Sequence, residues 1–232
     1  QQYNTLFRPS QEKYAKKCSY DFKVITDYIK EPKHPHLVSL NKILVCDYNW
    51  SKEYDFIIFV DADIIINKNT PPIHNEYSFG DKIGVVNQSQ PTLQARLDCQ
   101  KHKGYEVTAN DYYKLKCGLD INTDHIINTG VLVIQPKKHK LFLRNIFDSY
   151  FNNQIGNKSG FHYEQSVIGY EIQNNDLHYF MNMKWNALWA NNKYYFNTMK
   201  KQLLTLQQFY DDNYFIHLAG QCDYKLIPTI EL

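Results

Sequence analysis

Two aspartates separated by one residue directly follow a short apolar run. Residues 56–60 are all Phe, Ile or Val, and the acids are Asp61 and Asp63. Such a run is typical of a buried strand, and open α/β sheets bind ligands outside the carboxyl ends of their strands. Side chains at i and i+2 of an extended chain share a face, and two carboxylates there repel unless a cation lies between them. A divalent cation such as Mg²⁺ is the expected partner.

Composition and charge narrow the class of protein. The chain has 232 residues, which suits one α/β domain, and 43% hydrophobic residues allow a sizeable core. A net charge of +2 provides no basic field, so no nucleic-acid partner is expected. No apolar stretch approaches the ~20 residues that span a bilayer, so no membrane segment is expected. The five cysteines form no Cys-x-x-Cys pair, which argues against a zinc cage and for free thiols.

The sequence shows no signal peptide at Gln1. A soluble domain is therefore expected, cytoplasmic as the sequence stands. The lumenal part of a Golgi enzyme and a viral protein in host cytoplasm are alternatives.

Apolar spacing and turn residues predict strands that alternate with helices. Strands are expected at residues 22–26, 56–60, 83–87, 126–134 and 214–217, and helices at 11–19, 36–47, 137–151 and 161–172. Residues 88–124 form a long polar and aromatic connection, and such segments are often functional. This order predicts an α/β fold, with a mainly parallel central sheet flanked by helices, in one domain over residues 1–232.

Four elements in this order resemble the GT-A nucleotide-sugar glycosyltransferases. They are Phe-Val-Asp-Ala-Asp ending at Asp63, Asn-Thr-Gly-Val-Leu-Val-Ile from Asn128, Tyr-Glu-Gln-Ser around Glu164, and Ile-His-Leu-Ala-Gly ending at Gly220. The nearest branches are the galactomannan galactosyltransferase, yeast α-1,6-mannosyltransferase and plant xylosyltransferase family, with glycogenin-like relatives. The resemblance extends over most of the chain. It implies a GT-A, Rossmann-like domain that moves a sugar from a nucleotide diphosphate, expected to be UDP, to a glycan or other hydroxyl acceptor with retention.

The resemblance also implies roles for individual residues. Asp61, Asp63 and His217 would hold Mn²⁺, or Mg²⁺, on the donor diphosphate. Glu164 and Gln165 would be the catalytic pair that contacts the donor sugar. The remaining expected contacts with donor or acceptor are Lys42, Asn128, Gly130, Gly220 and Lys225.

Three departures from the family pattern qualify these roles. Glu164 stands where the family usually has Asp. The basic residue expected shortly after His-x-x-Gly is out of register, because residues 221–223 are Gln, Cys and Asp and Lys225 comes later. The family's first strand, which helps to hold the nucleobase, is not visible before the first expected helix. It is missing, disordered or abandoned.

The chemistry of sugar transfer agrees with this residue set. Negative charge grows on the diphosphate oxygens as the glycosidic bond breaks, and a bound cation stabilises that charge. Mn²⁺ accepts oxygen and imidazole ligands, which fits two aspartates and one histidine.

Each candidate also has a purely structural explanation. Asp61 and Asp63 could form an exposed turn, and His217 could be a core histidine. Glu164 could be an acid favoured at a helix N-terminus. The glycine in Asn128-Thr129-Gly130 could mark a β-bulge or a close approach of the backbone to a ligand. Aromatic residues could line an acceptor cleft, but core packing is expected for at least half of them: Tyr112, Tyr113, Trp185, Trp189, Tyr194 and Tyr195.

Other functions compete with sugar transfer. A haloacid-dehalogenase-type phosphatase also places Asp-x-Asp after an apolar strand, with the first Asp as nucleophile. That class has Thr or Val where this chain has Ile65, and its Gly-Asp-x-x-x-Asp motif is absent. A catalytically inactive GT-A domain that binds carbohydrate is a second alternative. A nucleotidyltransferase is a third, although the Gly-rich N-terminal phosphate loop that it requires is absent.

Overall fold

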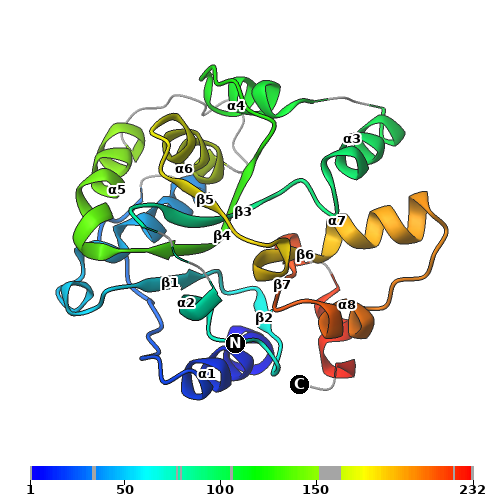
Figure 1. The fold of residues 1–232 in the computed structure, drawn as a ribbon, viewed down its shortest axis with the longest axis horizontal. Helices are drawn as coiled ribbons and strands as arrows, with labels where there is room; N and C mark the ends of the chain where they lie inside the picture. The colour runs from blue at the N-terminus through cyan, green and yellow to red at the C-terminus, as the bar shows by residue number, and fades with distance from the viewer. Residues whose placement is uncertain are drawn as a thin grey trace.

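A computed structural model describes residues 2–32, 35–76, 78, 80–104, 107–151, 163–221 and 223–230. In this part of the chain the strands form two sheets with helices around them (Figure 1). One sheet has the order β1-β4-β3-β5 and the other the order β2-β7-β6. The strands are β1 (Ile57–Val60), β2 (Ile64–Ile66), β3 (Ile83–Asn87), β4 (Ile127–Ile134), β5 (His178–Phe180), β6 (Ala187–Leu188) and β7 (Phe215–His217). The expected α/β class with a central sheet flanked by helices is confirmed.

The described helices include all four that the sequence predicts, with shifted ends. The α-helices are α1 (Arg8–Lys17), α2 (Ile73–Glu76), α3 (Leu93–His102), α4 (Ala109–Cys117), α5 (Pro136–Phe151), α6 (Tyr163–Asn174), α7 (Trp189–Lys193) and α8 (Leu206–Asp212). The 3₁₀ helices are η2 (Pro35–Asp47), η3 (Ser51–Glu53), η4 (Met183–Asn186), η6 (Ala219–Gln221) and η7 (Tyr224–Thr229), and the π-helices are η1 (Tyr3–Phe7) and η5 (Tyr194–Met199). The start expected for α6, at Phe161, lies outside the described residues.

The expectation of a mainly parallel sheet is wrong in the strand directions. Strand β4 runs antiparallel to both β1 and β3, and β2 runs antiparallel to β7. The β3–β5 and β6–β7 pairs are parallel. The prediction rested on unbroken apolar runs, and every residue of β4 is indeed buried. Such a run follows from burial on both faces, which a central antiparallel strand with helices on both sides also has.

Alternating side chains of β1 enter two different cores. Ile57 and Phe59 pack with residues of α4, α5, α6 and η2. Ile58 and Val60 pack on the other face with Tyr14 of α1 and Ile73 of α2, among others. Figure 1 shows the same division, with α4, α5 and α6 on one side of the four-stranded sheet and α1 and α2 on the other.

The long connection at residues 88–124 contains two helices that the periodicity did not predict. Thr92 caps α3 by accepting the Ala95 N–H. Thr108 and Asp111 form a capping box at the start of α4. The Thr-x-x-Asp spacing was a usable sequence signal, but the low apolar content of both helices hid their periodicity.

The strand expected at residues 22–26 is not formed. These residues have no regular secondary structure, and they lie along a cavity whose opposite wall is β1. A strand needs a neighbour about 4.8 Å away to share a ladder. The cavity separates the segment from the strand edge that it could have paired with, so β-branched composition alone did not produce a strand.

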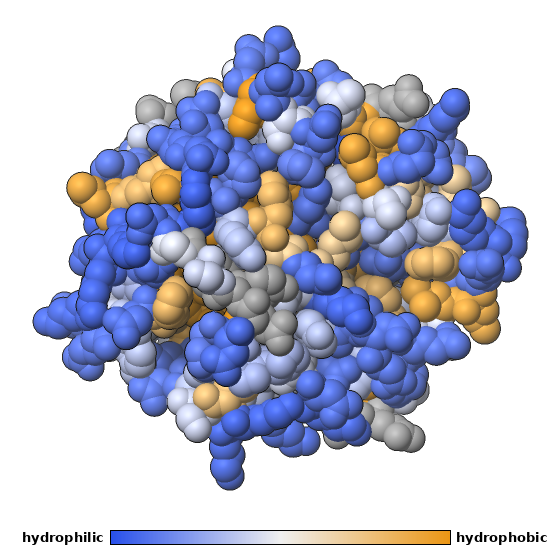
Figure 2. Space-filling model, in the orientation of Figure 1, coloured by the Kyte–Doolittle hydropathy of each residue, from blue (hydrophilic) through white to orange (hydrophobic). Residues whose placement is uncertain are grey.

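Exposed apolar side chains are scattered over the surface. Leu115, Leu141 and Leu203 are 67%, 72% and 81% exposed and belong to α4, α5 and the segment before α8. Figure 2 shows a mainly hydrophilic face with separate apolar groups. Scattered exposure of this kind is normal and needs no partner to explain it. Among the described residues, no helix combines the length and the apolar character that crossing a bilayer requires.

His139 gives the fold a testable pH dependence. Its Nδ1 accepts the Gln135 N–H at 3.0 Å and its Nε2 lies 3.0 Å from the Asp81 carbonyl oxygen, so the neutral ring satisfies both contacts. Burial lowers the pKa of His139 below its usual 6.5. As the pH falls past the region near 6.5, the unfolded chain therefore takes up a proton on this histidine that the folded chain does not bind. The free energy of unfolding should have its full value above this pH and should decrease below it.

Replacing His139 by Gln tests this prediction, because Gln keeps one acceptor and one donor but does not titrate. Urea midpoints at about pH 7.5 and 5.5 should fall less in His139→Gln than in the wild type. An equal fall in both proteins would show that other groups cause the pH dependence.

Candidate metal and donor site

Asp61, Asp63 and His217 come together as the sequence predicts. One potential ligand atom from each residue lies within 4.8 Å of the others. Asp61 follows β1, Asp63 precedes β2, and His217 is the last residue of β7. The aspartates do not share the face of an extended strand, which corrects the geometric argument from the sequence. Residues 62 and 63 form a turn where the chain passes from one sheet to the other.

Backbone hydrogen bonds hold this turn at both ends. The Asp61 N–H donates to the Gly130 carbonyl oxygen at 2.8 Å, and the Leu218 N–H donates to the Asp63 carbonyl oxygen at 3.0 Å. Gln11 of α1 donates through Nε2 to the Ile64 carbonyl oxygen at 2.9 Å. Both carboxylates are therefore carried by fixed backbone, between two sheets and a helix.

Lys42 lies directly against Asp61. Its side chain is only 6% exposed, and Nζ lies 2.9 and 3.2 Å from the two Asp61 carboxylate oxygens. Burial by itself would lower the pKa of Lys42, but the charges of Asp61 and Glu164 outweigh it and the pKa is raised. Lys42 is therefore a fixed positive charge in the site, and its contact with a donor stays a prediction.

Glu164 faces the site from the first turn of α6. Its side chain is 16% exposed, and Oε1 lies 3.8 Å from Lys42 Nζ. A carboxylate that only complemented the helix dipole would not need to reach this ammonium. The structure therefore places Glu164 beside the metal candidates, although none of the contacts among the described residues joins it to Asp63 or His217.

Asp63 is bound to His217. The distance from His217 Nε2 to Asp63 Oδ1 is 3.2 Å, and both groups are largely withdrawn from solvent. Burial raises the pKa of the Asp63 carboxyl, but a proton on His217 Nε2, through its hydrogen bond and its charge, outweighs the burial and the pKa is lowered. Asp63 is thus held in the ionised form that a metal ligand needs.

Gly130 makes room for the His217 ring. A Cβ added at Gly130 would lie 2.5 Å from His217 Cε1 and 2.6 Å from His217 Nδ1. Its backbone has no positive φ, so the reason for glycine is space. The β3–β4 register also shifts opposite this stretch, between Gly84 and Val86. The register shift agrees with the β-bulge that the sequence offered as one explanation. The close approach to a ligand stays a prediction, because the group against Gly130 is the His217 side chain.

Asn128 and Gln165 belong to a buried network of amides. Asn128 Nδ2 donates to Gln165 Oε1 at 3.0 Å, and Asn128 Oδ1 accepts the Gly130 N–H at 2.9 Å. Gln165 Nε2 donates to Gln88 Oε1 and to the Tyr112 hydroxyl. Gln165 is 4% exposed, so its amide is committed to the protein interior. Contact of either residue with a sugar stays a prediction.

Gly220 and Lys225 lie beyond His217. Gly220 has a φ of +73°, which the lack of a side chain allows, within the turn that follows β7. Lys225 is exposed on η7, and its role toward phosphate stays a prediction. Tyr224, which the sequence analysis did not consider, lies near enough to Asp63 to feel its charge. Burial raises the pKa of its hydroxyl to about 12, and the charge of Asp63 adds to the effect.

Sequence reasoning missed Asn186. It is fully buried at the end of η4, its Nδ2 donates to Asn128 Oδ1 at 2.7 Å, and its Oδ1 lies 2.9 Å from His217 Nδ1. The Lys-Trp-Asn-Ala-Leu-Trp stretch around it drew attention only through Trp185 and Trp189. Both tryptophans are buried in the core, as are Tyr112 and Tyr113, so core packing is confirmed for these four aromatic residues.

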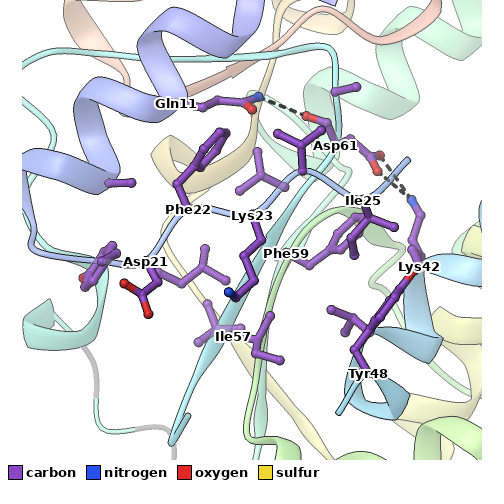
Figure 3. Close-up of a pocket in the computed structure, with 18 of the residues that line it drawn as sticks. Gln11, Asp21, Phe22, Lys23, Ile25, Lys42, Tyr48, Ile57, Phe59 and Asp61 are labelled. Carbon is purple, nitrogen blue, oxygen red and sulfur yellow. Dashed lines mark hydrogen bonds and ion pairs between the residues drawn. The ribbon is translucent and has the colours of Figure 1, made fainter. Parts of the chain in front are cut away.

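A cavity of about 780 Å³ begins beside Asp61 and Lys42. Figure 3 shows Ile57 and Phe59 of β1 on one wall and residues 21–25 on another, with the Lys42–Asp61 ion pair at the edge. Most of its lining is apolar or aromatic, including Tyr48 and Trp50. Its size and lining are typical of sites for small organic ligands.

The donor set fits a divalent cation. Two carboxylates and an imidazole converge, and Gly130 leaves space for the His217 ring. Three carboxylates and one ammonium leave two negative charges among Asp61, Asp63, Glu164 and Lys42 when His217 is neutral. Oxygen and imidazole ligands suit Mn²⁺, Mg²⁺ and related ions rather than soft metals.

Comparisons with known proteins identify the fold. No protein-family model and no curated protein sequence matches the chain. A crystal structure of a glycosyltransferase involved in the glycosylation of the major capsid of PBCV-1 matches with a TM-score of 0.62 and 13% identity, covering 98% of this chain and 93% of that one. The galactosyltransferase LgtC, in complex with donor and acceptor sugar analogs, matches with a TM-score of 0.51 and 16% identity, covering 88% and 71%.

At these identities the likeness establishes the fold. The chain has the fold of GT-A-type glycosyltransferases, which confirms the architecture that the four motifs implied. The specific branch of galactosyl-, mannosyl- and xylosyltransferases stays a prediction, as does the single-domain boundary at residues 1–232.

Gly130→Ala tests the geometry of the site. The new methyl group would collide with the His217 ring and displace it from Asp63. We expect Mn²⁺ affinity to fall by about 10- to 100-fold, because an imidazole ligand loses its orientation. Electron paramagnetic resonance of free Mn²⁺ measures the affinity. Thr129→Ser on the same strand is the control, since it keeps the hydroxyl near Lys42, and unchanged affinity in Gly130→Ala would contradict the prediction.

Proposed function

We propose that this chain is a metal-dependent glycosyltransferase that moves a sugar from a nucleotide diphosphate donor to a hydroxyl acceptor. The observation that carries the proposal is the convergence of Asp61, Asp63 and His217 at one turn of a GT-A-type fold. The two solved structures support the reaction class, because each is described as a glycosyltransferase. Retention of anomeric configuration rests on the family resemblance alone.

Asp61, Asp63 and His217 would hold the cation against the donor diphosphate. When bound, Mn²⁺ or Mg²⁺ supplies positive charge to the oxygens of the leaving group. Lys42, which is paired with Asp61, adds a second positive charge. In the reaction the anomeric carbon separates from the diphosphate oxygen, which keeps the electron pair. The same carbon bonds to the acceptor oxygen, whose proton passes to a base or to water.

Glu164 is the proposed catalytic carboxylate. It lies 3.8 Å from Lys42 and is mostly shielded from solvent, so its charge acts with little screening. Positive charge develops at the anomeric carbon as the leaving group departs, and a nearby carboxylate stabilises it in the transition state more than in the ground state. Gln165 was expected to share this role, but its buried amide supports a positioning role better than a direct contact.

The nucleoside of the donor would enter the cavity beside Asp61. Ligand pockets combine apolar and aromatic walls with a few polar groups, and this cavity has both next to the metal candidates. A uridine diphosphate sugar is the proposed donor, from the family resemblance, and a glycan or glycoconjugate is the proposed acceptor. A panel of UDP- and GDP-sugars with Mn²⁺, scored for donor hydrolysis, decides the donor, and tighter binding of GDP than UDP would exclude this choice.

The alternatives are less well supported. The phosphatase alternative is not favoured, because the two solved structures compared above are both described as glycosyltransferases. An inactive carbohydrate-binding GT-A domain would keep the site but not turn over. Calorimetry separates this case, since UDP binding with Mn²⁺ but no turnover of any donor would favour the inactive domain.

Metal dependence is the first test. Asp61→Ala and Asp63→Ala should each abolish Mn²⁺-dependent UDP binding in calorimetry, and EDTA should mimic them, because each change removes a charged ligand. His217→Ala should be milder, because it removes a neutral ligand. Asp55→Ala, at an exposed carboxylate on the surface, is the control. Unchanged UDP affinity in EDTA would refute the metal site.

Glu164→Gln tests the catalytic carboxylate. The substitution keeps the size and removes the charge, so turnover should fall by about 100-fold or more while Mn²⁺–UDP affinity changes little. Glu171→Gln on the same helix is the matched control, since Gln can still accept the Tyr150 hydroxyl. Steady-state kinetics and calorimetry are measured together, and an equal loss in binding and turnover would remove Glu164 from the transition-state role.

A further inference from the structure

A continuous chain of buried hydrogen bonds connects the candidate metal ligand His217 to the interior. It passes from the Gly130 N–H to Asn128, from Asn128 to Asn186, and from Asn186 to His217 Nδ1. The three side chains are 6%, 0% and 5% exposed. Water therefore has little access to these groups, and each hydrogen bond must join a donor of the protein to an acceptor of the protein.

One backbone N–H determines which atom donates and which atom accepts in each of these hydrogen bonds. A backbone N–H can only donate, so the atom of Asn128 that faces the Gly130 N–H must be its carbonyl oxygen. One amide atom of Asn186 lies 2.7 Å from the same oxygen, so this Asn186 atom must be the donor nitrogen. The remaining atom of the Asn186 amide is then its carbonyl oxygen, and it faces His217 Nδ1 at 2.9 Å.

This order decides which ring nitrogen of His217 carries hydrogen. The Asn186 oxygen can only accept, so His217 Nδ1 must be protonated. In a neutral imidazole the other nitrogen, Nε2, then bears the lone pair. That lone pair faces Asp63 Oδ1 at 3.2 Å. Two acceptors at this distance attract each other only with a cation, a proton or a metal ion, between them.

We propose that Asn186 is a positioning residue that holds His217 with Nδ1–H turned inward and Nε2 free to bind a metal ion. Asn128 and the Gly130 N–H hold Asn186 in turn. The proposal rests on the metal site of the proposed function and adds the group that orients its histidine. Partners of this kind fix the tautomer and the ring orientation of metal-binding histidines, and their loss typically lowers metal affinity by about 10- to 100-fold.

The same logic continues beyond Asn128. Its oxygen is occupied by Gly130 and Asn186, so its nitrogen must donate to Gln165 Oε1. The Gln165 nitrogen then donates to Gln88 and to the Tyr112 hydroxyl. His217 and Gln165, which come from motifs far apart in the sequence, are thereby fixed by one set of amide orientations.

The first experiment uses the wild-type protein without metal. A long-range ¹H–¹⁵N correlation spectrum at about pH 8.5, where an ordinary histidine is neutral, reports the tautomer of each ring. His217→Gln identifies the resonance among the nine histidines. The expected result is a His217 ring with hydrogen on Nδ1, with or without a second proton on Nε2. A ring with hydrogen on Nε2 alone would overturn the proposal, whatever the metal or transferase assays show.

The second experiment removes the acceptor. Asn186→Leu keeps a similar volume but offers His217 Nδ1 no partner, so the ring should show a mixture of tautomers and Mn²⁺ affinity should fall by about 10- to 100-fold. Asn192→Leu is the matched control. Asn192 is also buried nearby, and it donates to the Leu188 carbonyl oxygen and to Gln90 Oε1 rather than to the side chains of Asn128, Asn186 or His217. It should leave the His217 tautomer and Mn²⁺ affinity unchanged.

The outcomes separate this proposal from the proposed function. A folded Asn186→Leu protein with the wild-type tautomer and Mn²⁺ affinity overturns the positioning role. If Asn186→Leu does not fold, the wild-type spectrum decides. If Mn²⁺ binding survives Asp61→Ala, the metal site fails, but the Nδ1–H tautomer of His217 would still confirm the network.

Discussion

The site depends on one buried ammonium among three carboxylates. Lys42 Nζ contacts Asp61 directly and lies 3.8 Å from Glu164, and Asp63 adds to the same field. Without Lys42, three negative charges would share a region that is mostly shielded from water, and like charges there repel strongly. One positive charge is still insufficient. The remaining excess of two negative charges explains why residues held this firmly suit a divalent cation better than a neutral ligand.

The fold attaches Asp61 and Asp63 to backbone that hydrogen bonds hold in place rather than to flexible loops. The chain leaves one sheet after Asp61 and enters the other at Ile64, so the turn between them is tied to both sheets. Movement of Asp61 or Asp63 would break hydrogen bonds to Gly130 or Leu218. A site that is preorganised in this way spends little free energy on arranging its ligands when a cation and a diphosphate arrive.

The sequence predicted the parts of this site that depend on local pattern. Asp61, Asp63, His217 and Glu164 follow or precede recognisable apolar segments, and the structure brings all four into one region. Strand direction was not predictable, because a run buried on both faces has the same composition in either direction. The helices at Leu93–His102 and Ala109–Cys117 were hidden by weak apolar periodicity.

Asn186 was not predictable for a different reason. A buried asparagine has no sequence pattern of its own, and its role follows only from the groups that tertiary structure places around it. The same holds for residues 22–26, whose β-branched composition favoured a strand but whose potential partner lies across a cavity. The role of Asn186 and the missing strand at residues 22–26 both depend on contacts between segments far apart in the sequence. Residue spacing along the chain does not predict such contacts.

Gly130 shows how one position can satisfy several constraints together. Its carbonyl oxygen holds the Asp61 N–H, its own N–H sets the orientation of Asn128, and its missing side chain leaves space for the His217 ring. Any other residue except proline could supply the first two contacts, because they are made by the backbone carbonyl and N–H. Only glycine supplies the third without moving the ring. The Asn-x-Gly spacing therefore puts an amide and a position without a side chain on one strand. The amide acts on His217 Nδ1 through Asn186, and the missing side chain leaves space for His217 Cε1 and Nδ1.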